Sequence, residues 1–204
     1  MNDLLLQSPA APQRLFLLFH GVGATPQDLV PLGHVLAERY PDAAVVSVAA
    51  PDPSNLGGGL QWFSVLGVTE ENRPLRVATA LPRFLAKVQD WQQRVGVPRE
   101  RTTLVGFSQG AILALAATRV AQPPAARVVS LSGRFPALPK QPATGVRIHL
   151  LHGAADAVVP AEHAQSAAQA LQALGADVTL DVFPGLAHGI SRGVADRLLA
   201  LLGD

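Results

Sequence analysis

The hydrophobic residues of this chain fall into short continuous runs and do not alternate strictly with polar ones. Six runs, each rich in Val, Leu or Ile, predict buried strands at residues 15–19, 45–48, 102–106, 127–131, 146–151 and 178–182. Strands covered by helices on both faces have this pattern, whereas half-exposed strands alternate apolar and polar residues. Residues 3–7 are a candidate seventh strand, which Ser8 and Pro9 would join to the first run as a hairpin.

Helical patterns fill the intervals between these runs. Thr25 is a suitable N-cap, Pro26 fits the first helical position, and Asp28 stands where a capping-box acid belongs. This helix is expected to run towards Tyr40. Further helices are expected at about 75–95, 109–120, 161–174 and 189–202. The first of these contains Pro82, which predicts a kink or a break.

Alternation of strands and helices predicts the α/β class. We expect a mostly parallel sheet of six or seven strands with helices on both faces, forming one domain over residues 1–204. Apolar residues make up 49% of the chain and charged residues only 15%, against a usual charged share of about 25%. This composition predicts a well-filled core and excludes a disordered chain.

Charge and cysteine content exclude several classes of function. The net charge is +1 with no basic block, so nucleic-acid binding has no support. The absence of cysteine excludes disulfides, thiolate metal sites and a cysteine nucleophile. Asp3 stands where a signal peptide needs a base, and the uncharged stretch 102–118 is interrupted by Gly106 and Gly110. We therefore expect a cytoplasmic protein without stable membrane insertion, metal or cofactor; the sequence does not distinguish a monomer from an oligomer.

The third predicted strand leads into Gly106-Phe107-Ser108-Gln109-Gly110, a Gly-x-Ser-x-Gly motif. In parallel α/β sheets, ligands bind beyond the carboxyl ends of the strands. The motif forms a sharp turn between a strand and a helix, which holds the serine in a strained backbone conformation. Glycines flank the serine because side chains there would collide with the neighbouring strand and helix. Ser108 is therefore a candidate nucleophile.

A serine nucleophile needs a base, which must be a neighbouring residue in the fold. We assign this role to His188, which lies in a loop after the last predicted strand. The other five histidines lie in predicted helices, inside a strand or at strand ends: His34, His163, His149, His20 and His152. The two at strand ends each precede a glycine, which favours a backbone-shaping or hydrogen-bonding role.

The base in turn needs an orienting acid. Asp156 follows the fifth predicted strand, and Pro160 would begin the next helix, which leaves Asp156 outside it. Asp52, in the long loop 50–73, is the rival candidate, but it precedes the serine in the chain. With Asp156 as the acid, a nucleophile, an acid and a base each follow a different strand.

The residues His20-Gly21-Val22-Gly23 after the first strand have two interpretations. As a dinucleotide fingerprint they lack the third glycine, because Pro26 occupies its place, and no acid ends the second strand near Val48. As an oxyanion hole, the amide of Val22 would act together with that of Gln109, directly after the serine. The helix that begins at Gln109 adds a favourable dipole end.

Five motifs occur in order over nearly the whole chain: residues 18–23, Gln61-Trp62-Phe63, residues 106–111, residues 151–160, and Leu186-Ala187-His188. With them the chain resembles the α/β-hydrolase superfamily, and within it the phospholipase/carboxylesterase family of acyl-protein thioesterases and small bacterial serine esterases. The resemblance implies an α/β-hydrolase fold and a catalytic triad of Ser108, Asp156 and His188.

The same resemblance implies that Val22 and Gln109 are the oxyanion donors and that Gln61, Trp62 and Phe63 line the acyl or alcohol pocket. Family members often carry an acid after the Trp-Phe pair, where this chain has Ser64. The apolar face of loop 50–73 has a second interpretation, as a core plug under the loop.

The interval 132–145 is too short for a cap domain, so we expect an open site. The predicted function is a serine carboxylesterase that hydrolyses small-molecule esters of short to medium acyl chain through an acyl-enzyme. The alternatives are an acyl-thioesterase or lysophospholipase with the same triad, and a non-catalytic hydrolase-like binding protein.

Overall fold

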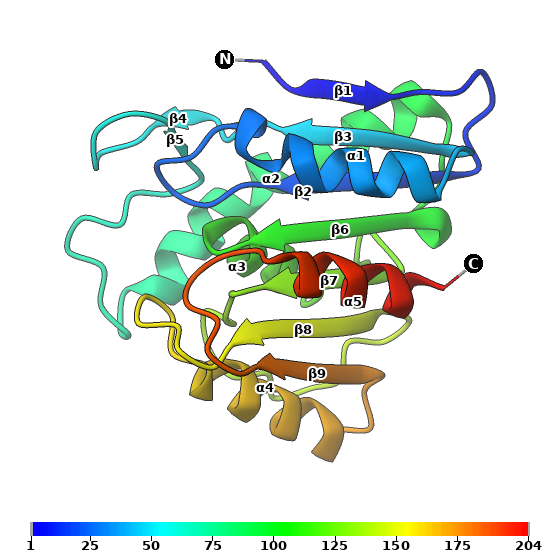
Figure 1. The fold of residues 1–204 in the computed structure, drawn as a ribbon. Helices are drawn as coiled ribbons and strands as arrows, with labels where there is room; N and C mark the ends of the chain where they lie inside the picture. The colour runs from blue at the N-terminus through cyan, green and yellow to red at the C-terminus, as the bar shows by residue number, and fades with distance from the viewer. Residues whose placement is uncertain (1, 204) are drawn as a thin grey trace.

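The computed structural model describes residues 2–203 and contains a seven-stranded sheet of order β1-β3-β2-β6-β7-β8-β9 (Figure 1). Its strands are β1 (Leu4–Gln7), β2 (Arg14–Phe19), β3 (Ala43–Val48), β6 (Thr102–Phe107), β7 (Arg127–Leu131), β8 (Arg147–Gly153) and β9 (Val178–Phe183). All neighbours are parallel except β1 and β3. The prediction of a mostly parallel sheet is confirmed, and the six predicted strands are present with ends shifted by at most two residues.

The predicted hairpin between the first two strands is wrong. β1 pairs antiparallel with β3, with Leu4 opposite Ser47, and does not pair with β2. The reason lies in the sheet order, because β2 already has parallel partners on both sides, β3 and β6. The outer edge of β3 is the position left for β1. Gln7 secures it there by donating through Nε2 to the carbonyl oxygens of Tyr40 and Ala43, both at 2.8 Å.

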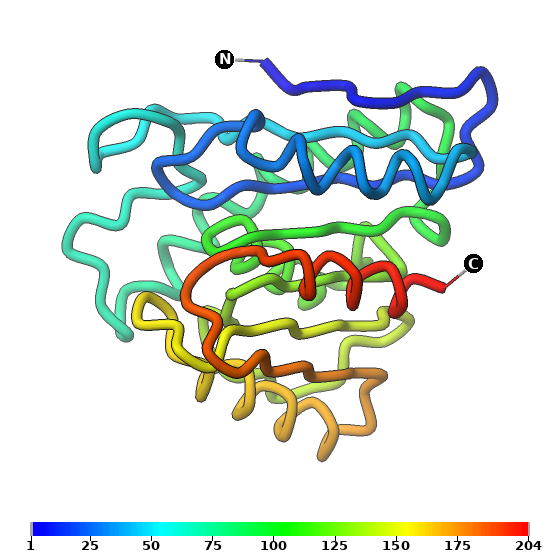
Figure 2. Tube along the Cα trace, viewed as in Figure 1, coloured from blue at the N-terminus to red at the C-terminus, as the bar shows by residue number. Residues whose placement is uncertain are grey.

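Helices cover both faces of the sheet, as Figures 1 and 2 show. The helices are α1 (Val30–Arg39), α2 (Arg73–Val95), α3 (Gln109–Ala117), α4 (Glu162–Ala173) and α5 (Arg192–Leu202), with 3-10 turns at Pro26–Leu29 and Arg99–Arg101. One apolar layer packs beneath α1 and α5, and the other beneath α2, α3 and α4. Every residue of α3 is buried, which explains the continuous apolar run that follows Gln109 and Gly110.

Local signals explain two of these boundaries. The Thr25 amide donates to the Asp28 carboxylate at 2.8 Å, as a capping box requires, although the turn it caps is 3-10 and α1 begins only at Val30. α2 ends at Gly96, whose φ of 69° suits glycine. α2 continues through Pro82, so of the expected kink or break, the break does not occur. Pro82 lies on the exposed face of α2, where water can satisfy the carbonyl that its missing N–H leaves unpaired, while the opposite face packs on the sheet.

The loop 50–73 contains only a short hairpin of β4 (Asp52–Pro53) and β5 (Leu60–Gln61). The segment between β7 and β8 contains no helix or strand, so no cap covers the carboxyl ends of the central strands. The architecture is that of an α/β hydrolase. None of the helices within residues 2–203 is both long and apolar enough to cross a bilayer.

Candidate active site

Ser108 occupies the sharp turn between β6 and α3, with φ 52° and ψ −114°. Few residues other than glycine adopt a positive φ, so the backbone here is strained. A Cβ atom on Gly106 would lie 2.5 Å from the Ala111 backbone, and one on Gly110 would overlap the Phe19 carbonyl. These contacts confirm the steric reason for both glycines of the motif. The Ser108 amide donates to the Leu131 carbonyl at 2.9 Å, which ties the turn to β7.

His188 lies between Ser108 and Asp156. Its Nε2 is 3.0 Å from Ser108 Oγ, and its Nδ1 is 2.7 Å from Asp156 Oδ2. The three residues follow the carboxyl ends of β6, β8 and β9, which lie at the same end of the sheet. The ring of Phe107 packs on the imidazole with centroids 5.0 Å apart. The structure therefore brings together the three residues that the sequence analysis selected as nucleophile, acid and base.

The carboxylate of Asp156 is fully buried and held from two sides. Its Oδ1 accepts hydrogen bonds from the amides of Val158 and Val159, both at 2.9 Å, which leaves Oδ2 for His188. Burial alone would raise the pKa of Asp156, but the hydrogen bonds from His188, Val159 and Val158 outweigh it and lower the pKa below the usual range. Asp156 therefore stays ionised at neutral pH and can orient the imidazole.

The histidines at the two strand ends make structural hydrogen bonds. His20 Nδ1 donates to the Gly21 carbonyl at 2.8 Å, and its Nε2 accepts from the Ala50 amide at 3.1 Å. Burial lowers the pKa of His20, which agrees with a neutral imidazole. His152 donates through Nε2 to the Val159 carbonyl at 2.7 Å and lies 3.3 Å from Asp156 Oδ2, so it supports the acid.

Asp52, the rival acid, lies elsewhere. Its carboxylate pairs with Arg83 of α2 at 3.0 Å on the surface of the molecule. Within residues 2–203, no group of three or more His, Asp or Glu side chains is arranged to hold a metal ion.

The two amides predicted for an oxyanion hole lie next to Ser108 and are unused. Neither the Val22 nor the Gln109 amide donates a hydrogen bond to any residue within 2–203. A Cβ on Gly21 would lie 3.2 Å from Ser108 Cβ, so the loop after β2 runs directly against the serine. A pair of amide–carbonyl bonds holds that loop, from Gly23 to Leu60 and from Leu60 to Ala24, both at 2.8 Å. Unpaired amides suit a developing anion, and that of Gln109 also lies at the N-terminus of α3.

The Gln109 side chain has a role that the sequence analysis missed. Its Oε1 accepts from the Trp62 amide at 2.8 Å, and its Nε2 donates to the Phe63 carbonyl at 2.7 Å. The residue after the serine thus anchors the loop that walls the site. Because the partners are backbone atoms more than forty residues away, no local pattern in the sequence marks them.

The rings of Trp62 and Phe63 are buried, with 3% and 8% of their surface exposed. Trp62 packs edge-on against Phe19 and Phe84, and its Nε1 donates to the His20 carbonyl at 2.9 Å. Gln61 is also buried, and its amide hydrogen-bonds Asn55. These packing contacts agree with the second interpretation of the loop, a core plug, and place the three side chains beneath the loop.

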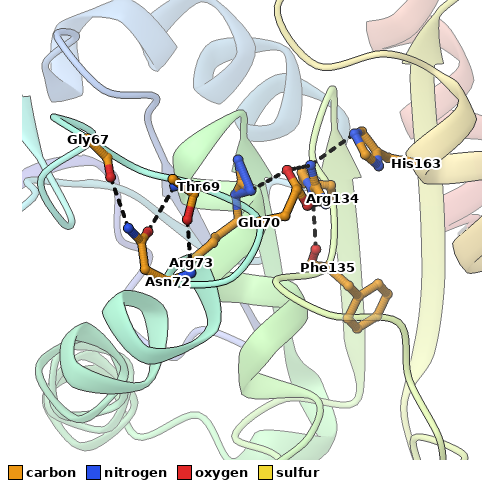
Figure 3. Close-up of polar contacts among 8 residues, drawn as sticks. All are labelled: Gly67, Thr69, Glu70, Asn72, Arg73, Arg134, Phe135 and His163. Atoms are coloured by element: carbon orange, nitrogen blue, oxygen red, sulfur yellow. Dashed lines mark hydrogen bonds and ion pairs between the residues drawn. The ribbon is translucent and has the colours of Figure 1, made fainter.

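A polar cluster of Glu70, Arg73, Arg134 and His163 attaches the far end of this loop to the sheet (Figure 3). Arg134, which follows β7 and is only 12% exposed, binds both oxygens of Glu70, at 2.9 and 2.6 Å. Its Nη1 also lies 2.9 Å from His163 Nε2, and Arg73 donates to Glu70 at 2.7 Å. The Arg134 hydrogen bonds are the main reason that the pKa of Glu70 is lowered. Sequence analysis missed this cluster because two loops and two helices, far apart in the chain, contribute to it.

Comparisons with known proteins agree with this architecture. The phospholipase/carboxylesterase family model matches residues 2–197. The chain is 45% identical over 190 residues to Esterase YpfH of Escherichia coli K12, covering 93% of this chain and 82% of that protein. It is 30% identical over 116 residues to Acyl-protein thioesterase 1 of Gibberella zeae, covering 52% and 49% of the two chains. The crystal structure of esterase PE8 superposes with a TM-score of 0.88 at 29% identity, covering 98% of this chain and 97% of that one.

Proposed function

Because this chain belongs to the phospholipase/carboxylesterase family of hydrolases, we propose that it is a serine carboxylesterase acting through Ser108, His188 and Asp156. The observation that carries the proposal is the position of His188. Its two ring nitrogens lie 3.0 Å from Ser108 Oγ and 2.7 Å from Asp156 Oδ2. This is the geometry in which an imidazole can take a proton from a serine while an acid holds it in the required tautomer.

The reaction runs in two steps. In the first, Ser108 Oγ attacks the ester carbonyl carbon as His188 Nε2 accepts the hydroxyl proton, and the amides of Val22 and Gln109 hold the oxyanion. The protonated imidazole then returns that proton to the departing alcohol, which leaves an acyl group on Ser108. In the second step, His188 takes a proton from water and the hydroxide attacks the acyl carbon. The imidazolium then returns that proton to Ser108 Oγ as the acyl–oxygen bond breaks, which releases the carboxylic acid and restores the free serine.

The open carboxyl end of the sheet supports the proposed substrate class. No cap domain closes over Ser108, and the neighbouring walls are the loop 50–73 and the segment after β7. We place a small-molecule ester of short to medium acyl chain against the backbone of Gln61–Phe63, which Gln109 holds in position. Trp62 and Phe63 support this wall from below, so they act on substrate binding through the shape of the loop.

A thioester is the second candidate substrate. It is favoured by the 30% identity to Acyl-protein thioesterase 1, although the match covers about half of either chain. The same nucleophile, base and oxyanion donors serve a thioester, because the tetrahedral intermediate carries its charge on the same oxygen. Ester and thioester substrates of matched acyl length separate the two functions, since the carboxylesterase proposal requires the higher kcat/KM on the ester.

The nucleophile is tested with Ser108→Ala and a matched control, Ser64→Ala, at a half-buried position of the loop 50–73. With p-nitrophenyl butyrate, Ser108→Ala is expected to lose at least about 10³-fold in kcat/KM, whereas Ser64→Ala stays within about twofold. A fluorophosphonate should label Ser108 in the unaltered chain, as identified by peptide mass spectrometry. Full activity of Ser108→Ala, or labelling at another serine, would contradict the proposal.

A further inference from the structure

The end of the sheet opposite Ser108 has a row of arginines. The four adjacent strands β2, β6, β7 and β8 begin at, or directly after, Arg14, Arg101, Arg127 and Arg147 respectively. The register places Arg127 beside Arg147, and Leu15 beside Thr102, so neighbouring strands bring the four side chains into one row. Arg14, Arg127 and Arg147 also share one face, since the residue after each of them packs in the opposite layer. Arg101 ends the 3-10 turn directly before β6.

Only the two arginines at the ends of this row form ion pairs with acidic side chains. Arg14 pairs with Asp42 at 3.4 Å, and Arg147 pairs with Asp177 at 2.6 Å. Asp42 and Asp177 immediately precede β3 and β9, the strands that flank these four in the sheet. The two central arginines have only neutral partners, with no carboxylate bound to them within residues 2–203.

The central guanidinium groups keep most of their donors free. Arg101 donates to Gln13 Oε1 at 2.9 Å, and Arg127 donates to the Leu202 carbonyl at the end of α5 at 3.0 Å. Burial, and then the nearby charge of Arg147, lower the pKa of Arg127, so a half-buried cation faces another cation there. An anion placed between these groups would relieve that repulsion.

The row borders a hollow of about 900 Å³, whose lining includes all four arginines. That volume lies at the upper end of the range of small-molecule sites. Thr103 and Thr144 add hydroxyl groups to the same lining. A guanidinium matches the paired oxygens of a phosphate better than any other side chain, because its N–H groups form a rigid fork.

We propose that this arginine groove binds a phosphate-bearing small molecule, at a site separate from Ser108. The separation follows from the strand lengths: β6 runs from Thr102 to Phe107, so roughly 20 Å of sheet lies between the groove and the nucleophile. The ligand therefore cannot place its phosphate in the groove and its reacting atom at Ser108 unless it is long and wraps the sheet edge. Binding here is independent of the proposed ester hydrolysis.

The test is a calorimetric titration at fixed ionic strength with inorganic pyrophosphate, and in a second arm with a nucleoside diphosphate. The unaltered chain is expected to bind at least one of the two saturably, with Kd below about 1 mM. Arg127→Gln and Arg101→Gln are each expected to weaken binding about tenfold, because each removes charge-assisted hydrogen bonds. Arg101 is exposed, so its variant tests the site even if the change at the half-buried Arg127 disturbs folding.

Two controls make the outcome decisive. Arg192→Gln removes an equal charge from a side chain that is 94% exposed at the far end of α5, and it should bind as the unaltered chain does. Ser108→Ala should also bind normally, which separates this site from the proposed active site. Tighter binding of pyrophosphate indicates an inorganic ligand, and tighter binding of the diphosphate indicates an organic phosphate; either supports the proposal. No saturable binding of either ligand, or equal weakening in Arg192→Gln, overturns it.

Discussion

Replacing Asp156 by Asn should invert the tautomer of His188 and thereby abolish most of the activity. The side chain of Asp156 is fully buried, and an asparagine of nearly the same shape would occupy the same space. Only one terminal atom changes: a carboxylate oxygen, which accepts hydrogen bonds, becomes an NH₂ group, which donates them. The outcome depends on whether the NH₂ group takes the place of Oδ1 or of Oδ2, and the neighbouring hydrogen-bond donors determine this.

The amides of Val158 and Val159 both donate to Oδ1, at 2.9 Å. Turning the NH₂ group towards these two donors would lose both hydrogen bonds, so the opposite orientation is favoured by about 2–3 kcal/mol. In the favoured orientation the NH₂ group faces His188 Nδ1, which must then accept a hydrogen bond. The imidazole proton moves to Nε2, the atom that faces Ser108 Oγ at 3.0 Å, and His188 can no longer accept the serine proton.

A preference of that size leaves roughly 1% of the molecules in the productive orientation. Loss of the negative charge beside the imidazolium removes a further factor of about 10 to 100, since hydrogen bonds to a charged group contribute about 1.5–3 kcal/mol. We therefore expect kcat/KM to fall about 10³- to 10⁴-fold, similar to the loss of about 10⁴ in kcat that the same change causes in a serine protease triad.

The assay is the hydrolysis of p-nitrophenyl butyrate, with circular dichroism to verify that the variant is folded. The matched control is Asp52→Asn, which breaks the surface ion pair with Arg83 and should change kcat/KM by less than about twofold. Retention of more than about a tenth of the activity by folded Asp156→Asn would refute the orientation argument. A larger loss in Asp52→Asn than in Asp156→Asn would refute the assignment of the acid.

Three further variants test the surroundings of the site and the core. Gln109→Ala keeps the backbone amide but loses the bonds to the loop wall, so the free energy of unfolding in urea should fall by about 1–3 kcal/mol; an unchanged value would contradict the anchoring role. Glu70→Gln weakens the pair with Arg134 at a mostly exposed position, so deuterium exchange should accelerate in residues 64–72 with little change in global stability, and unaltered exchange there would count against the cluster. The pKa of His149 is lowered to about 4, mainly by burial, so the unfolded chain binds a proton between pH 6.5 and 4 that the folded chain does not. Stability should therefore fall by about 3 kcal/mol as pH drops through that window, and His149→Leu should flatten this slope; an equal slope in both chains would refute it.

The sequence predicted the strands well because all of the six except the edge strand β9 are largely buried on both faces, and burial leaves a continuous apolar run that is easy to read. It predicted the partner of β1 wrongly, because pairing depends on which strand has a free edge in the sheet. The apolar runs of the sequence do not reveal the strand order. It expected a kink or a break at Pro82, and the helix does not break there because the opposite face of α2 packs on the core. Local patterns thus identify elements, while neighbours determine how the elements pair and continue.

The same distinction between local pattern and tertiary contact applies to the candidate site. Residue type and position after a strand were sufficient to select Ser108, Asp156 and His188, because parallel strands bring their carboxyl ends to one edge whatever the details of packing. The anchoring role of the Gln109 side chain and the Glu70–Arg134 cluster were not foreseen. Both depend on atoms that are far apart in the chain, and the distance between such atoms is set only when the loops fold onto the sheet.

By itself, the sequence determined the class of this protein: its strand-and-helix alternation, its Gly-x-Ser-x-Gly turn and the order of its serine, acid and histidine. Tertiary structure decided what depends on convergence in space. It brought His188 within hydrogen-bond distance of Ser108 and Asp156 and buried Trp62 and Phe63 beneath the loop. It also placed four arginines around one hollow at the opposite end of the sheet. Local patterns record backbone preference and burial, whereas convergence depends on strand order and register, which many distant residues determine together.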